Sequence, residues 1–151
     1  MNKIFRKESL TSIDSDYARW CEEQAAFLRM RNFSIVDIEN IAEEIESLGR
    51  SDRREIRSRL QVLLIHLLKW KFQKEKRCGS WKGSIAEARK NIEILLQESP
   101  SLKSYPQSIL PDEYEFALFK AIDETDLDEA LFPAQCPFTI TEILDQKYLP
   151  Q

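Results

Sequence analysis

The stretch from Ile38 to Trp70, IENIAEEIESLGRSDRREIRSRLQVLLIHLLKW, decides the fold of this chain. It contains no proline and a single glycine, Gly49, and its apolar residues recur at steps of three and four. An α-helix returns to the same face with that period. The apolar positions on this face are Ile38, Ile41, Ile45 and Leu48 before the glycine, and Ile56, Leu60, Leu63, Leu67 and Trp70 after it.

Gly49 leaves two interpretations of this stretch open. Either one helix ends at the glycine and Ser51 caps a second helix, or a single helix continues, with or without a bend. A turn usually brings several helix breakers, whereas a glycine inside a helix costs only about 1 kcal/mol relative to alanine. The apolar pattern also resumes in phase if Asp52 takes the intervening place. We therefore favour one long helix from residue 35 to about residue 76.

The residues before this stretch predict one shorter helix. Apolar residues between Tyr17 and Leu28 share a face, so we expect a helix over about 16–31 that Asp14 or Ser15 caps. Ser34 followed by Asp37 is a cap signal for the long helix.

The residues after the long helix predict further helices and no strand. A break at 77–80 precedes a third helix over 81–97, and Pro111 suits the first turn of a fourth helix. Residues 101–110 are expected to form a short helix or turn. Thr139 or Thr141 is placed to cap one short helix in the tail.

These patterns predict an all-α fold. We expect a polar arm over residues 1–13 and a single helical domain over residues 14–150, a bundle around one long helix with an irregular, proline-containing tail. The 151 residues suffice for one domain, and the three glycines argue against hairpins and barrels. The longest apolar run, Leu60 to Leu68, is shorter than the roughly 18 residues of a membrane span, and Met1 to Leu10 lacks an apolar signal core. We therefore expect a cytoplasmic protein that does not contact membranes.

The cysteines indicate neither disulfides nor a metal centre. Cys21, Cys78 and Cys136 form no CxxC pair, and the one histidine, His66, cannot complete a Cys/His zinc set. We interpret them as reduced thiols and expect no metal and no cofactor.

Charge is segregated along the chain beneath a net charge of −4. Residues 50–77 carry ten basic and three acidic residues, whereas residues 112–145 carry ten acidic residues and one lysine. Such a chain can fold its two charged parts together, or it can present two faces to different partners.

His66 is the main candidate for catalysis, because it is the one histidine and lies in an otherwise apolar run, with Lys69 and Trp70 following within one helical turn. As a general acid or base it would work with Lys69 or Arg89, which would steer an anionic substrate. Arg59 and His66 also fit the loose Arg-x4–6-His spacing of helical ribonucleases, in which the arginine stabilises charge and the histidine moves a proton. The alternative, which we favour, is a core histidine that bonds neighbouring polar groups.

The candidates for binding are an arginine stripe and an aromatic residue. Trp81 more often anchors a helix junction than it stacks on a ligand, and the pI of about 5.2 lacks the basic footprint of a dedicated nucleic-acid binder. Glu46 and Glu55 lie four residues before Arg50 and Arg59, so internal ion pairs are the simpler interpretation. The stripe consists of Arg50, Arg53, Arg54 and Arg57.

Short motifs along the chain resemble those of a known family. They are Tyr17, Trp20 and Gln24; IENIAEEIE over 38–46; Leu48-Gly49-Arg50; HLLKW over 66–70; Ser80-Trp81 with Ile85 and Arg89; SPSL over 99–102; Phe132-Pro133; Cys136-Pro137; and Tyr148-Leu149-Pro150.

On these motifs the chain resembles the bacterial domain of unknown function numbered twenty-nine, common in photosynthetic bacteria. The resemblance implies an all-helical fold of this length and no activity. Lys74-Glu75 stands where family members tend to have a proline, and Pro106 and Pro111 interrupt a stretch that is often more continuously helical.

The sequence thus favours a non-enzymatic helical adaptor or regulator that binds another protein or a second copy of itself. The alternative is a small metal-independent ribonuclease built on Arg59 and His66. A third interpretation, weak nucleic-acid binding through the arginine stripe, requires binding that falls steeply with salt.

Overall fold

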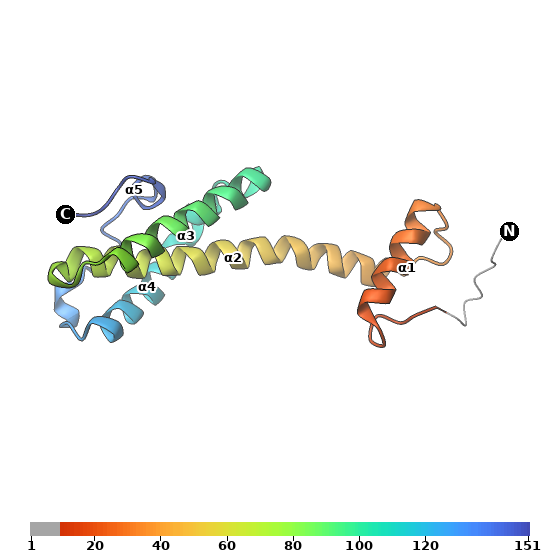
Figure 1. The fold of residues 1–151 in the computed structure, drawn as a ribbon, viewed down its shortest axis with the longest axis horizontal. Coiled ribbons are helices and arrows are strands. Elements are labelled where there is room, and N and C mark those ends of the chain that lie inside the picture. The colour runs from red at the N-terminus through yellow and green to blue at the C-terminus, as the bar shows by residue number, and fades with distance from the viewer. Residues whose placement is uncertain (1–9) are drawn as a thin grey trace. The chain divides into compact units, whose positions relative to one another are not determined.

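The computed structural model describes residues 10–151, and this part of the chain is helical without any strand. The all-α prediction and the long helix are confirmed (Figure 1). The α-helices are α1 (Tyr17–Arg29), α2 (Ile38–Phe72), α3 (Gly79–Glu98), α4 (Tyr105–Thr125) and α5 (Ile140–Leu144), and the 3-10 helices are η2 (Lys74–Lys76), η3 (Pro100–Leu102) and η4 (Glu129–Leu131).

Helix α2 continues through Gly49, which confirms the one-helix interpretation. Gly49 has no positive φ, and a Cβ built on it would meet no atom within 4 Å. The helix stops at Phe72, earlier than predicted, because Gln73 leaves the helical conformation. The buried Gln73 side chain donates to the carbonyl of Thr125 at 3.3 Å, which ties the end of α2 to the end of α4.

The chain divides into two compact units, Met1–Arg50 and Ser51–Gln151, with the boundary inside α2. A single domain over residues 14–150 therefore stays a prediction. Of the predicted N-terminal arm, residues 1–9 lie outside the described residues.

The first unit is held by contacts between α1 and the start of α2. Trp20 and Gln24 are buried on α1, and both bond to Asp37. The Trp20 indole Nε1 donates to the Asp37 carboxylate at 3.3 Å. The backbone amide of Asp37 donates to the side-chain carbonyl of Gln24 at 2.8 Å. Asp16, rather than Asp14 or Ser15, caps α1, because its carboxylate accepts from the Arg19 amide at 3.0 Å. The Ser15 hydroxyl instead bonds back to the preceding turn.

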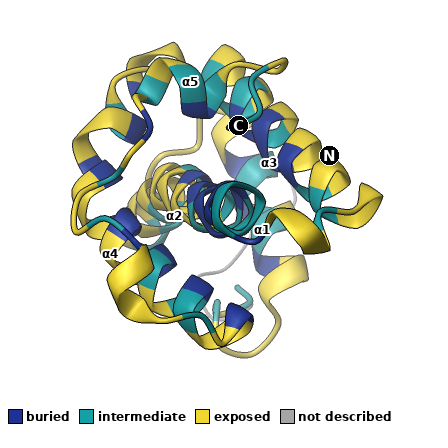
Figure 2. Ribbon diagram, turned by 90° about the vertical axis from the view of Figure 1, so that its left-hand side faces the viewer, coloured by how far each residue is buried: buried dark blue, intermediate teal, exposed yellow. Residues whose placement is uncertain are grey.

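The second unit has a core in which α3, α4 and α5 surround the second half of α2, with their buried residues facing inward (Figure 2). Burying this apolar surface is the main favourable contribution to the fold. The side chains of this core include Leu60, Leu63, Leu64, Leu67 and Leu68 from α2, Ile85, Ala88 and Ile92 from α3, Tyr114, Ala117 and Ala121 from α4, and Phe132, Phe138 and Ile143 after it.

The predicted start of the fourth helix was wrong. Helix α4 begins at Tyr105, with Pro106 in its first turn, and Pro111 lies inside it. An interior proline removes one backbone hydrogen bond, here the one to the Gln107 carbonyl. Water can bond the Gln107 carbonyl instead, because Gln107 is exposed. Burial of Ile109 in the core stabilises the helical turn before Pro111. Residues 101–110 are thus mostly the first turns of α4.

The remaining boundaries differ from the prediction by a few residues. Helix α3 starts at Gly79, so Gly79 and Ser80 belong to its first turn rather than to a break. Thr139, one of the two predicted caps, caps α5. It exchanges hydrogen bonds with Glu142 in a capping box. In the described part of the chain, no helix is both long and apolar enough to cross a membrane.

Candidate functional site

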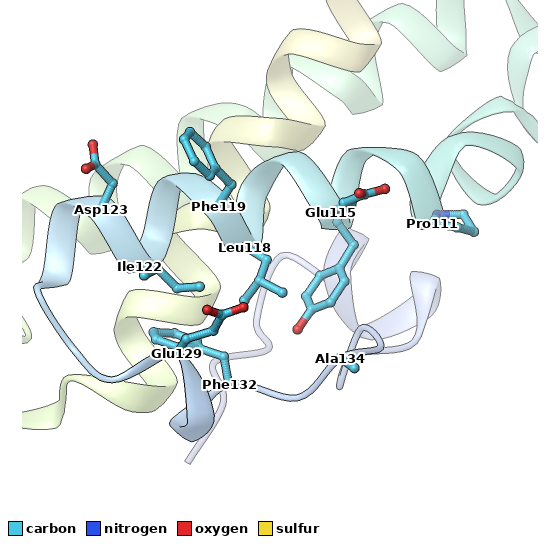
Figure 3. Close-up of a pocket in the computed structure, with 10 residues that line it drawn as sticks. Pro111, Glu115, Leu118, Phe119, Ile122, Asp123, Glu129, Phe132 and Ala134 are labelled. Carbon is cyan, nitrogen blue, oxygen red and sulfur yellow. The ribbon is translucent and has the colours of Figure 1, made fainter.

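A groove of about 840 Å³ lies between α4 and the segment that contains η4 in the second unit. Figure 3 shows Leu118 and Ile122 of α4 pointing toward Glu129 and Phe132 on the opposite wall. The groove is lined by Pro111, Tyr114, Glu115, Leu118, Phe119, Ile122, Asp123, Glu129, Phe132 and Ala134.

Contacts beneath the surface fix the two walls of this groove. The buried Tyr114 of α4 donates its hydroxyl to the Pro133 carbonyl at 2.6 Å. The buried Phe132 packs its ring 5.0 Å from the ring of Phe72 at the end of α2. Because both walls are anchored in the core, the groove is a preformed feature of the fold.

The groove combines apolar surface with uncompensated negative charge. Leu118 and Ile122 are half-buried, and 67% of Phe119 is exposed at the rim. Glu115, Asp123 and Glu129 are exposed and form no ion pair with any described residue, and no Lys or Arg lines the groove. Burial raises the pKa of the Tyr114 hydroxyl to about 12, so it stays protonated and donates at neutral pH. This surface can hold apolar and cationic groups.

His66 and Arg59 lie on α2, two turns or about 10 Å apart along the helix axis. His66 is half-buried, and its Nδ1 lies 2.8 Å from the Val62 carbonyl of its own helix. Arg59 pairs with Glu55 at 2.7 Å and lies 3.9 Å from Glu87. Two carboxylates beside the guanidinium oppose the approach of a phosphate.

Lys69 joins three helices of the second unit. Its ammonium pairs with Glu124 of α4 at 3.0 Å and lies 4.7 Å from the centre of the Trp81 ring of α3. Only 13% of the Lys69 side chain is exposed. The structure thus brings Lys69 and Trp81 together in a cation–π contact, and the lysine charge is compensated within the fold.

Arg89 holds the C-terminal segment. It is only 2% exposed, and its guanidinium donates to the carbonyls of Ile143 at 2.7 Å, Tyr148 at 2.7 Å and Glu142 at 3.1 Å. Burial lowers the pKa of Arg89, and the nearby charge of Asp145 acts in the opposite direction. Its donors are directed at the chain's own backbone rather than at solvent.

The arginine stripe is largely engaged with neighbouring side chains. Arg50 pairs with Glu46 at 3.6 Å, and Arg57 pairs with the buried Glu113 of α4 at 2.8 Å. The guanidinium of Arg53 lies 6.0 Å from the centre of the Tyr105 ring. Arg54, the remaining member of the stripe, is exposed.

Sequence reasoning missed the groove. The spacing of Tyr114, Ala117, Leu118, Ala121 and Ile122 along the fourth helix predicts one buried face, yet Leu118 and Ile122 are only half-buried in the structure. A signal was present: Phe116 and Phe119 lie off that face, so the helix is apolar on more than one side. Exposed aromatic residues between carboxylates indicate a contact surface.

The fold and this groove define a class: an all-α protein with a preformed, acidic-rimmed apolar groove on α4. Within the described residues, no cluster of His, Cys, Asp or Glu is arranged to hold a metal ion. A family model described as "Domain of unknown function DUF29" matches residues 13–149, and the chain belongs to this family. No curated protein and no solved structure gives a significant match.

Proposed function

We propose that this chain is a helical interaction protein without catalytic activity, an adaptor or regulator that binds another protein through the groove on α4. The observation that carries the proposal is the groove itself, with the exposed Phe119 at its rim and the exposed Leu131 of η4 nearby. Contiguous apolar surface that water contacts is unfavourable, and it is typical of surfaces that a partner covers.

The partners of the candidate catalytic residues support a non-enzymatic role. Lys69 is neutralised by Glu124, Arg59 is flanked by two carboxylates, and the Nδ1 of His66 is bonded within its own helix. A general acid or base needs a proton-transfer partner in reach, and a phosphate site needs free positive charge. The ribonuclease alternative would require these contacts to be exchanged on binding RNA.

Self-association has an observation of its own in the first unit. Ile38, Ile45 and Leu48 on α2 are exposed and, with the half-buried Ile41, follow the 3-4-3 spacing of a coiled-coil seam. A second copy of the chain is the partner that this seam fits. Sedimentation of the wild type and of Ile45→Glu tests it, because a charge in the seam would turn a dimer into a monomer.

The groove proposal is tested with a photo-crosslinking amino acid in place of Phe119, in lysate of the source organism. Glu98, which is exposed on α3, is the matched control position. We expect one stoichiometric crosslinked protein from position 119 and none from position 98. The same pattern should disappear when Leu118→Asp is added. Equal labelling from both positions, or none from position 119, would contradict the proposal.

A further inference from the structure

We propose that the partner segment held by the α4 groove is a cationic amphipathic helix, with apolar residues on one face and lysine or arginine beside them. This inference rests on the proposed function, because it specifies the partner of the same groove.

The groove presents apolar side chains that a partner must cover. Leu118 and Ile122 point across the groove toward Phe132, whereas Phe119, which also lines the groove, projects from the other side of α4 (Figure 3). Leu118 and Ile122 occupy successive turns of α4 and, together with Phe132 opposite them, offer an apolar strip. A partner must bring apolar side chains to cover this strip, since polar groups placed there would lose their hydration without gaining hydrogen bonds.

The charge of the partner follows from the carboxylates around the strip. Glu115 and Asp123 lie on α4 and Glu129 lies on the opposite wall, and none of them pairs with a described cation. Asp112, Asp126 and Asp128 are exposed in the same part of the chain. Positive side chains that flank the apolar face of a partner would meet this negative potential, which favours such partners and rejects acidic ones.

The helical form of the partner follows from the walls. From Pro111 to Asp123 the lining residues extend about 18 Å along α4, the length of some three helical turns. A partner strand would need a free sheet edge for its backbone hydrogen bonds, and the groove walls are helix α4 on one side and η4 with a short irregular segment on the other. A helix satisfies its own backbone and can place residues at i, i+3, i+4 and i+7 along the strip.

The probe is a synthetic helical peptide with leucine at positions i, i+3, i+4 and i+7 and lysine elsewhere. Its affinity for the full chain is measured by titration calorimetry. Two matched peptides accompany it: one with glutamate in place of lysine, and one of the same composition without a helical apolar face. We expect the lysine peptide to bind at least about tenfold more tightly than either control, and added salt to weaken it.

Variants of the chain separate the groove from general attraction to an acidic protein. Asp123→Asn with Glu129→Gln should weaken the lysine peptide about five- to tenfold, whereas Glu98→Gln on α3 should leave its affinity unchanged. Phe119→Ser should weaken it through the apolar rim, and circular dichroism should show an intact fold, because Phe119 is largely exposed.

The outcomes distinguish this inference from the proposed function. If the lysine peptide does not bind, if the control peptides bind equally, or if Asp123→Asn with Glu129→Gln has no more effect than Glu98→Gln, the cationic helix is wrong. A specific crosslink from position 119 would then still support the groove as a protein-binding site. If position 119 also captures nothing, both proposals fail.

Discussion

The Nε of Arg89 on α3 lies 2.7 Å from the carbonyl oxygen of Ile143 on α5, and both residues are buried. Two further donors of the same guanidinium reach the carbonyls of Glu142 and Tyr148. One side chain thus satisfies three backbone acceptors of a segment that has only one short helix. A hydrogen bond to a charged group contributes about 1.5–3 kcal/mol, more than a neutral one.

Arg89→Leu should therefore lower the free energy of unfolding by about 3–5 kcal/mol, because it leaves carbonyls without donors. Arg89→Lys should recover only part of the loss, since an ammonium cannot reproduce the planar fork of donors. Urea unfolding followed by circular dichroism measures both. Lys90→Leu, next to it and exposed, is the control and should stay within about 0.5 kcal/mol of the wild type. A comparable loss in the control would refute the role of Arg89.

Tyr114 should make stability fall at high pH. Its pKa is raised to about 12 by burial, above the ordinary value near 10, so the folded chain keeps a proton that the unfolded chain releases. The contribution is complete below pH 10 and is lost as the pH rises from 10 through 12. We expect it to be about 1–2 kcal/mol, a reduced figure because the ring borders an open groove.

The matched variant is Tyr114→Phe, compared with the wild type by urea unfolding at several pH values. Near neutral pH the variant should be less stable by about 1 kcal/mol, because the hydrogen bond to the Pro133 carbonyl is gone. Above pH 11 the difference should shrink or reverse. A difference that is constant with pH would show that Tyr114 does not titrate in this way.

Gly49→Ala should stabilise the chain. Gly49 lies inside α2 with ordinary helical φ, and an added Cβ would contact nothing. Alanine is favoured over glycine in a helix interior by about 1 kcal/mol. We expect a higher midpoint of thermal unfolding in circular dichroism, and a similar effect for Gly83→Ala in α3, where the added Cβ also meets nothing. Loss of stability at position 49 alone would mean that α2 must bend there.

An RNA cleavage assay tests whether His66 and Arg59 are catalytic. We expect the wild type to leave a fluorescent single-stranded RNA intact in the presence of chelator, and Arg59→Ala to behave identically. His66→Ala should lower stability by only about 1 kcal/mol, since it loses one hydrogen bond within its own helix. Cleavage by the wild type that disappears in a folded His66→Ala variant would instead establish the ribonuclease.

Much of the fold could be predicted from local patterns. The apolar spacing from Ile38 to Trp70 and the lack of proline favoured one long helix, and Thr139 was one of the two residues predicted to cap the short helix α5. Helix α4 could not be placed this way. Pro111 is a helix-start signal in the sequence. However, Pro106, Ile109 and Leu110 are buried against the core, and this burial stabilises a helix that begins earlier.

The candidate site was less predictable, because it depends on which faces remain uncovered. The sequence shows that Leu118 and Ile122 are apolar and share a helix with Tyr114, and an apolar stripe predicts burial. The Glu46–Arg50 and Glu55–Arg59 pairs were predicted, since four-residue spacing places their side chains together on any helix.

Periodicity, composition and charge order along the chain thus sufficed for the all-α class, the long helix and the separation of basic and acidic segments, because these depend on neighbours within a few turns. Tertiary packing decided that Arg89 holds the C-terminal segment, that Glu113 and Glu124 pair with Arg57 and Lys69, and that the groove on α4 keeps its carboxylates unpaired. Such contacts join residues many positions apart, and which of them form depends on how the helices share one core.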